Sequence, residues 1–174
     1  MTSLFKIGIL TASDRSHRGE REDQSGLVLK RLAGNIPGEV IAYHVLPDEK
    51  DAIQEMLIHM ADDLHCDLIL TTGGTGLAPR DVTPEATRLV LDREIPGIAE
   101  AIRAAGMRRK ATAMLSRGLS GSRGKSLIIN LPGSPHAVEE SFQIFRPVLE
   151  HALDLIRGEA GDCLKSPSLS HSRS

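Results

Sequence analysis

Aromatic residues are scarce in this chain of 174 residues, which has no Trp, one Tyr and three Phe. Proteins that bind single-stranded nucleic acid stack bases on aromatic rings, so the scarcity argues against that function. The two cysteines, Cys66 and Cys163, lack metal-site spacing, as expected in a reduced cytoplasm. No apolar run approaches the ~20 residues of a membrane span. Residues 4–10 are too short a run, and too broken by Lys6, for a signal peptide. We therefore expect a cytoplasmic protein without a membrane partner.

The net charge is also small. It is −2, with 25% of residues charged, so no nucleic-acid partner is expected. The length fits one domain that buries about two-thirds of its unfolded surface. We assign residues 1–159 to this domain. The last ten residues contain five serines and little to bury, so residues 160–174 are predicted to form a disordered tail.

Strand and helix patterns alternate along the domain. Apolar runs predict strands at residues 5–11, 40–46, 68–71 and 126–131, and residues 117–123 favour a further short strand. Helical patterns cover residues 25–33, 48–64, 83–92, 97 to about 109, and a last helix from Ser134-Pro135 in which Pro147 should produce a kink. This alternation predicts an α/β fold with three layers, a mostly parallel sheet with helices on both faces.

The most informative segment follows the third predicted strand and reads TTGGTGLAPRDVTPEAT, residues 71–87. Its glycines allow backbone N–H groups to turn toward an anion, and the following helix adds the positive end of its dipole. Thr83 and Pro84 suit the N-cap and first residue of that helix. Because open α/β sheets bind ligands at the carboxyl ends of their strands, the segment predicts a phosphate-binding loop.

Two aspartates lie where this loop would bind its ligand. Asp48 follows the second predicted strand and suits either an N-cap or a magnesium ligand. Asp81 could pair with Arg80 or cap the backbone. A carboxylate beside bound phosphate is repelled unless a cation or reacting group is present, which favours a functional role.

Three motifs of other protein classes are incomplete or absent. Gly124-Lys125-Ser126 resembles the end of a P-loop, but residue 119 is leucine instead of glycine and a strand follows instead of a helix, so we reject it. The seven histidines lack the His-Glu-x-x-His spacing of a zinc site, and no Gly-x-Ser-x-Gly elbow occurs.

The segment at residues 71–87 closely resembles the signature of the MogA-type molybdopterin adenylyltransferases. Further motifs of that family follow in the expected order between about residues 5 and 157: Ser-Asp at 13–14, Pro-Asp-Glu at 47–49, Leu-Ser-Arg at 115–117 and Pro-Gly-Ser-Pro at 132–135. The resemblance implies adenylylation of molybdopterin by Mg-ATP, and a homotrimer that hands its product to a molybdenum-insertion enzyme.

The resemblance also implies roles for individual residues. Asp48 and Asp81 would be catalytic and bind Mg²⁺. Nucleotide binding would fall to Thr72, Gly73, Gly74, Thr75, Gly76, Pro132, Gly133 and Ser134. Ser13, Asp14, Ser116 and Arg117 would bind the pterin substrate, with Arg117, Arg123 or Lys125 receiving its terminal phosphate. Helix caps for Ser13, Asp14 and Ser134, and a solvated basic face for the cations, are the structural alternatives.

Two other functions stay open at this point. Related MoaB-type proteins can be inactive, so the chain could be a molybdopterin carrier or scaffold. The competence-protein type of nucleotide pyrophosphatase or deamidase shares the fold, but normally carries a second domain that this chain lacks. The two aspartates and the intact glycine-rich loop favour the adenylyltransferase.

Overall fold

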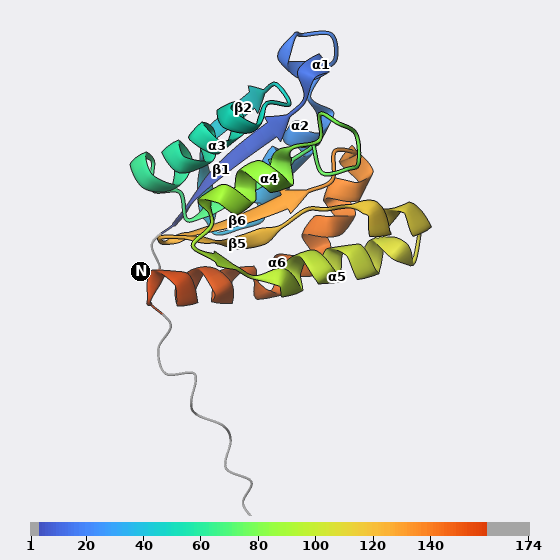
Figure 1. Ribbon diagram of the computed structural model, residues 1–174. Coiled ribbons are helices and arrows are strands. Elements are labelled where there is room, and N and C mark those ends of the chain that lie inside the picture. The colour runs from blue at the N-terminus through green and yellow to red at the C-terminus, as the bar shows by residue number, and fades with distance from the viewer. Residues whose placement is uncertain (1–3, 160–174) are drawn as a thin grey trace, which may run out of the picture.

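Six strands form one sheet in the computed structural model, in the order β2-β1-β3-β6-β5-β4 (Figure 1). Their bounds are β1 Phe5–Ala12, β2 Gly38–Leu46, β3 Leu68–Thr72, β4 Arg93–Glu94, β5 Ser120–Arg123 and β6 Ser126–Leu131. The structure describes residues 4–159, so the predicted tail lies outside it.

Strand direction determines which loops meet. β1 pairs in parallel with β2 and β3, and β3 pairs in parallel with β6, in a register that runs from Leu68 opposite Leu127 to Thr72 opposite Leu131. β5 runs antiparallel to both β6 and β4. The carboxyl ends of β2, β1, β3 and β6 therefore share one edge of the sheet with the amino end of β5.

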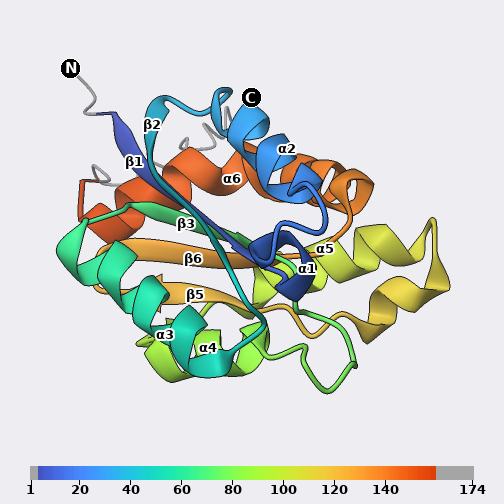
Figure 2. The ribbon, with the colours of Figure 1, turned by 90° about the horizontal axis from the view of Figure 1, so that it is seen from above.

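Helices cover both faces of the sheet, as expected (Figures 1 and 2). Their bounds are α1 Asp14–His17, α2 Gln24–Ala33, α3 Lys50–Ile58, α4 Thr83–Val90, α5 Pro96–Met107 and α6 Pro135–Arg157, with a π-helical turn η1 His59–Asp63 and a 3₁₀ segment η2 Ala111–Leu115. α2, α5 and α6 contribute to one apolar cluster, and α3 and α4 to the other.

The central strands are buried on both sides because each face has its own core. Leu68 and Leu70 of β3 join the cluster beneath α2, α5 and α6, whereas Ile69 joins the cluster beneath α3 and α4. Cys66, just before β3, is 1% exposed and belongs to the second cluster, which confirms its expected role as a small buried residue. Burial raises the pKa of its thiol to about 11.

The sequence predicted the main elements with small errors at their ends. All four long strands are present, and β5 occupies part of the segment 117–123. The two-residue β4 was not predicted, because a strand of this length leaves no periodic pattern. Thr83 is the first residue of α4 and Val82 is its N-cap, so the predicted cap is wrong by one residue. α6 extends through Pro147 without a break in the helix, and the predicted kink stays a prediction.

Asp48 is not the cap of the helix that follows it. α3 begins at Lys50, and Glu49 occupies the N-cap position without a side-chain hydrogen bond to the helix. The carboxylate of Asp48 instead accepts a hydrogen bond from the backbone N–H of Asp14. The structural alternative for Asp48 is therefore wrong. Among the helices of residues 4–159, none has the length and apolar character that crossing a bilayer requires.

We expect Phe142→Ala to lower the free energy of unfolding by about 3–5 kcal/mol, because it leaves a cavity in the first core cluster. Phe142 is 1% exposed and contacts Phe145 edge-to-face, with ring centroids 5.3 Å apart. Urea denaturation measures the loss. Leu155→Ala in the same helix is the control, because Leu155 is 53% exposed and should change stability by less than about 0.5 kcal/mol. Equal losses in the two variants would contradict this packing.

Candidate active site

The site lies at the sheet edge where the parallel strands end. Asp14, Asp48, Gly73 and Pro132 each lie in the first two residues after one of these strands, and Ser116 and Arg117 precede β5 at the same edge. The topology therefore gathers the residues that the sequence nominated for catalysis, nucleotide binding and pterin binding, except for two of the three candidates for the pterin phosphate.

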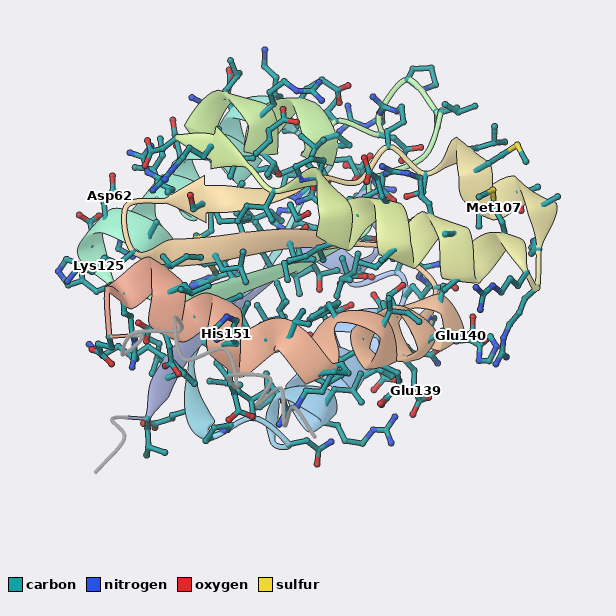
Figure 3. All side chains as sticks on the ribbon, turned by 90° about the horizontal axis from the view of Figure 1, so that it is seen from below. Asp62, Met107, Lys125, Glu139, Glu140 and His151 are labelled. Atoms are coloured by element: carbon teal, nitrogen blue, oxygen red, sulfur yellow. The ribbon has the colours of Figure 1, made fainter. Side chains whose placement is uncertain are left out.

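Arg123 and Lys125 lie at the opposite edge, because Arg123 is the last residue of β5 and Lys125 lies in the turn that follows it. Figure 3 shows Lys125 and Asp62 at one end of the molecule, with Glu140 and Met107 at the other. Arg123 binds the Asp62 carboxylate through two nitrogens and the carbonyl of Val90 through a third. These two cations are therefore excluded as receivers of a substrate phosphate at this site. The sequence could not show this, because the direction of β5 was unknown.

The glycine-rich loop begins with two residues that require glycine. Gly73 and Gly74 have φ angles of 91° and 64°, in the left-handed region that other residues rarely adopt. A Cβ on Gly73 would lie 2.2 Å from the carbonyl oxygen of Ala12, so this turn packs directly against the end of β1. A Cβ on Gly133 would lie 3.3 Å from Cα of Gly73. The loop is thus held between β1 and the segment after β6.

Three consecutive carbonyl groups of the loop accept hydrogen bonds from the protein. Gly74 O accepts from the N–H of Thr83 at 3.1 Å, Thr75 O from the N–H of Arg117 at 2.9 Å, and Gly76 O from Nε of Arg117 at 2.8 Å. The described residues contain no cis peptide bond. In a trans peptide the following N–H points away from the C=O. The N–H groups of Thr75, Gly76 and Leu77 therefore point away from α4 and Arg117.

These three N–H groups donate to no protein acceptor within residues 4–159. Adjacent N–H groups in a turn that includes left-handed residues form an anion-binding concavity, and the nearby N-terminus of α4 favours negative charge. The predicted phosphate loop thus has the geometry that phosphate binding requires.

Two carboxylates flank this loop. Oδ1 of Asp48 lies 3.3 Å from the position that a Cβ on Gly74 would take, and Oδ2 of Asp81 lies 2.8 Å from the corresponding position on Gly76. Oδ2 of Asp81 also accepts a hydrogen bond from the N–H of Ala78 at 2.9 Å, so Asp81 has the backbone-capping role that the sequence left open. That bond leaves its other carboxylate oxygen without a protein donor among the described residues.

Asp14 fixes the position of Asp48. The N–H of Asp14 donates to Oδ2 of Asp48 at 2.9 Å, and the N–H of Asp48 donates to Oδ1 of Asp14 at 3.0 Å. Burial raises the pKa of the Asp48 carboxyl, and the negative charges of Asp14 and Asp81 raise it further. Half-buried Asp48 therefore lies in a region of concentrated negative charge.

Arg80 compensates part of that charge from the tip of the loop. Its Nε and Nη2 contact Oδ2 and Oδ1 of Asp14 at 2.5 and 2.9 Å. The hydrogen bond from Arg80 lowers the pKa of the Asp14 carboxyl to about 2. The sequence suggested Asp81 as the partner of Arg80. That suggestion is wrong because Asp14, which belongs to a different strand end, lies closer.

The donor set fits a magnesium ion only when a phosphate is also bound. No three His, Cys, Asp or Glu side chains in residues 4–159 form a group that could bind a metal without other ligands. Magnesium, however, usually takes one or two carboxylates together with substrate phosphates and water. Asp48 and Asp81, on either side of outward-pointing loop amides, supply that number of carboxylates, and the excess negative charge favours a cation.

The segment Pro132-Gly133-Ser134 closes one side of the loop. The hydroxyl of Thr72 donates to the carbonyl of Pro132 at 2.7 Å, and Ser134 caps α6 by accepting from the N–H of Ala137 at 3.2 Å. The structural role predicted for Ser134 is confirmed. Ser13 also acts as a cap, because its hydroxyl accepts from the N–H of Ser16 at the start of α1.

A cavity of about 930 Å³ opens beside the loop, between α5, η2 and the first turns of α6. Thr75 and Gly76 form its boundary with the loop, and Ser116, Pro132 and Ser134 also line it. The lining includes the basic groups of Arg103, Arg108, Arg109 and Lys110 and the carboxylates of Glu139 and Glu140. Arg109 forms an ion pair with Glu140. Its size is in the range of small-molecule sites. Ser13 and Asp14 are absent from the lining and lie on the other side of the loop.

Two residues near the loop, Arg103 and Thr83, received no functional role from the sequence. Arg103 donates to the carbonyls of Ser116 and Gly118 and lines the cavity, and Thr83 has a buried hydroxyl without a protein partner in the described part of the chain. The run Arg108-Arg109-Lys110 was a detectable signal, because three cations directly after a helix indicate an anion-attracting rim. Arg103 gave no such signal, because its role depends on a contact with a distant segment.

A glycine-rich loop with outward amides and rim carboxylates, at the carboxyl ends of parallel strands, is typical of α/β proteins that bind phosphorylated ligands. Residues 8–151 match a family model described as a probable molybdopterin binding domain. The chain belongs to this family of molybdenum cofactor biosynthesis proteins, and the resemblance seen in the sequence is confirmed.

Individual proteins of this family are also similar to the chain over most of its length. The molybdopterin adenylyltransferase of Helicobacter pylori strain J99 is 43% identical over 154 residues, which cover 87% of this chain and 88% of the relative. The molybdopterin adenylyltransferase of Escherichia coli K12 is 40% identical over 144 residues, covering 81% and 73%. The crystal structure of the molybdopterin biosynthesis enzyme MoaB from Thermus thermophilus is 53% identical with a TM-score of 0.85, covering 89% of this chain and 98% of the other.

Removing Arg80 should return the pKa of Asp14 toward its ordinary value of 3.8. The lowered pKa means that Asp14 favours folding above about pH 4, and that this contribution is lost as the pH falls toward 2. In Arg80→Ala, carboxyl ¹³C shifts followed against pH should place the Asp14 midpoint at least one pH unit higher than in the wild type. Arg88→Ala should leave it unchanged, because Arg88 pairs with Glu94 instead. An unchanged midpoint in Arg80→Ala would rule out the pairing.

Proposed function

We propose that this protein is a molybdopterin adenylyltransferase. An oxygen of the terminal phosphate of molybdopterin attacks the α-phosphorus of ATP, the bond between the α-phosphorus and the bridging oxygen breaks, and pyrophosphate leaves. The observation that carries the proposal is the loop at residues 73–77. The carbonyls of Gly74, Thr75 and Gly76 accept hydrogen bonds from the protein, while the N–H groups of Thr75, Gly76 and Leu77 donate to no acceptor within residues 4–159. Family membership supports the same reaction, because relatives of matching length are molybdopterin adenylyltransferases.

The protein's part in this reaction is positioning and charge stabilisation. Both substrates are anions, so their phosphates repel each other until the site compensates their charge. The outward amides of Thr75, Gly76 and Leu77 hold nucleotide phosphate oxygens, and the dipole of α4 favours the same negative charge. Fixed donors of this kind stabilise developing charge in the transition state without reorganisation, because the fold has already oriented them.

Asp48 and Asp81 hold Mg²⁺ in this proposal. When bound, the ion screens the phosphates and stabilises the leaving pyrophosphate. Asp14 contributes indirectly, because its two hydrogen bonds with Asp48 and its ion pair with Arg80 fix the acidic side of the loop. This replaces the direct contact with pterin that the resemblance implied for Asp14.

The cavity beside the loop gives room for the ring systems. Pro132, Gly133 and Ser134 place the nucleoside, since this segment contacts the loop through Thr72 and Gly73. Ser116 places the pterin from the opposite wall of the cavity. Basic residues at the rim, including Arg108 and Lys110, favour entry of the negatively charged substrates.

The remaining features are carried by the resemblance alone. We propose a cytoplasmic homotrimer that releases adenylylated molybdopterin to a molybdenum-insertion enzyme. The carrier and pyrophosphatase alternatives predict different products: a carrier binds molybdopterin without transfer, and a pyrophosphatase cleaves the nucleotide without pterin.

We expect Asp81→Asn to lower adenylyl transfer by about 10²–10³-fold, because it removes one charged group from the reacting centre. Asparagine keeps an oxygen that can accept from the N–H of Ala78, so the loop should keep its conformation. The measurement follows label from α-labelled ATP onto molybdopterin with Mg²⁺ present, with circular dichroism as the check on folding.

Asp92→Asn is the matched control. Oδ2 of Asp92 likewise accepts a backbone N–H, from Gly124 at 2.7 Å, but it lies toward the opposite edge of the sheet. This variant should transfer label at the wild-type rate. Wild-type turnover by Asp81→Asn would remove Asp81 from the mechanism. Tight pterin binding by the wild type without any transfer would favour the carrier.

A further inference from the structure

Arg117 contacts the glycine-rich loop from the side opposite the free amides. It lies in the segment between η2 and β5, and its side chain is 34% exposed. Its backbone N–H donates to Thr75 O, its Nε to Gly76 O at 2.8 Å and its Nη2 to Asp81 O at 2.7 Å. Its Nη1 binds the carboxylate of Glu85 in the first turn of α4.

These contacts join the two ends of an irregular segment. Gly76 and Asp81 delimit the loop tip, residues 77–80, in which Leu77 is 65% exposed. The guanidinium of Arg117 contacts both Gly76 O and Asp81 O. The distance between these two ends of the loop tip therefore depends on the planar shape of the guanidinium. Glu85 holds the guanidinium in this orientation and supplies the opposite charge.

The opposite charges of Arg117 and Glu85 indicate that Arg117 has a structural partner. Burial alone would raise the pKa of Glu85, but the hydrogen bond and positive charge of Arg117 bring it below its ordinary value. All three guanidinium nitrogens of Arg117 donate to protein groups. A phosphate ligand would have to displace these bonds, so direct phosphate binding is disfavoured.

We propose that Arg117 is a positioning residue that orients the phosphate-binding amides of Thr75, Gly76 and Leu77 and fixes the main chain at Asp81. It donates hydrogen bonds to Thr75 O and Gly76 O, which belong to two of the three peptide planes concerned, and in each trans peptide the N–H then points toward the ligand. Its importance for catalysis depends on the proposed adenylyl transfer, whereas its effect on the loop does not. This replaces the role as phosphate receiver that the resemblance implied.

Lysine is the informative substitution at this position. It keeps the positive charge, but its single ammonium group cannot reproduce the planar fork that reaches Gly76 O, Asp81 O and Glu85 together. If residue 117 bound phosphate directly, the lysine variant would keep much of that function. If residue 117 orients two peptide planes, the lysine variant loses more. We expect Arg117→Lys to lower the rate of transfer by about 10- to 100-fold, as is typical when supporting residues of a site are changed.

The first test uses nuclear magnetic resonance on the full chain with inorganic pyrophosphate as the probe. In the wild type, pyrophosphate should shift the backbone amides of residues 75–77 and leave the Nε–H signal of Arg117 in place. A large shift of the Nε–H signal with unmoved amides would overturn the proposal in favour of direct phosphate binding. This experiment needs no variant, so it remains valid if Arg117→Lys does not fold.

The second test compares Arg117→Lys with Arg123→Lys, whose parent arginine also binds a carboxylate and a backbone carbonyl but at the opposite edge. Without ligand, the amides of residues 75–77 should move only in Arg117→Lys, which should also bind pyrophosphate at least 10-fold more weakly. Unchanged amides and affinity would overturn the positioning role. A third outcome separates the two proposals. If pyrophosphate shifts the amides of residues 75–77 in the wild type and Arg117→Lys moves them, but the wild type transfers no adenylyl group, only the proposed function is refuted.

Discussion

The orientation of the peptide planes after β3 is the constraint on which the rest of the site depends. The N–H groups of the loop bind phosphate together only when they point to the same side. The carbonyls of the same peptide planes must therefore find hydrogen-bond donors on the opposite side. The N–H of Thr83 and the side chain and backbone of Arg117 supply these bonds. Positive φ angles at Gly73 and Gly74 make the turn sharp enough to bring the loop against the end of β1.

The fold supports this loop with polar groups buried beneath it. The side-chain amide of Asn130 donates to the hydroxyls of Thr71 and Thr87, which links β6 to β3 and to α4. Its side-chain oxygen accepts from the N–H of Leu119, which adds the segment before β5. Buried polar groups are costly unless bonded, so this network favours one relative position of the elements around the loop. A rigid base of this kind suits a reaction that depends on alignment.

Charge is distributed unequally across the loop. Asp14, Asp48 and Asp81 lie toward the ends of β1 and β2, whereas Arg103 and the cations at residues 108–110 line the cavity on the side of β5 and β6. A cation is favoured on the first side and anionic substrates on the second. The phosphate loop lies between them, so a metal-bound nucleotide and a phosphorylated partner can meet there from different directions.

The sequence by itself determined the elements of this protein and the identity of its central loop. Apolar runs gave the four long strands, and the string from Thr71 to Thr87 gave the phosphate loop, because glycine, proline and capping residues act on their immediate neighbours. Only the tertiary structure decided which distant groups act together. In the folded chain Arg80 contacts Asp14, Arg117 contacts the loop, and Arg123 lies at the opposite end of the sheet. These contacts depend on strand order and direction, which are set by packing across the whole sheet.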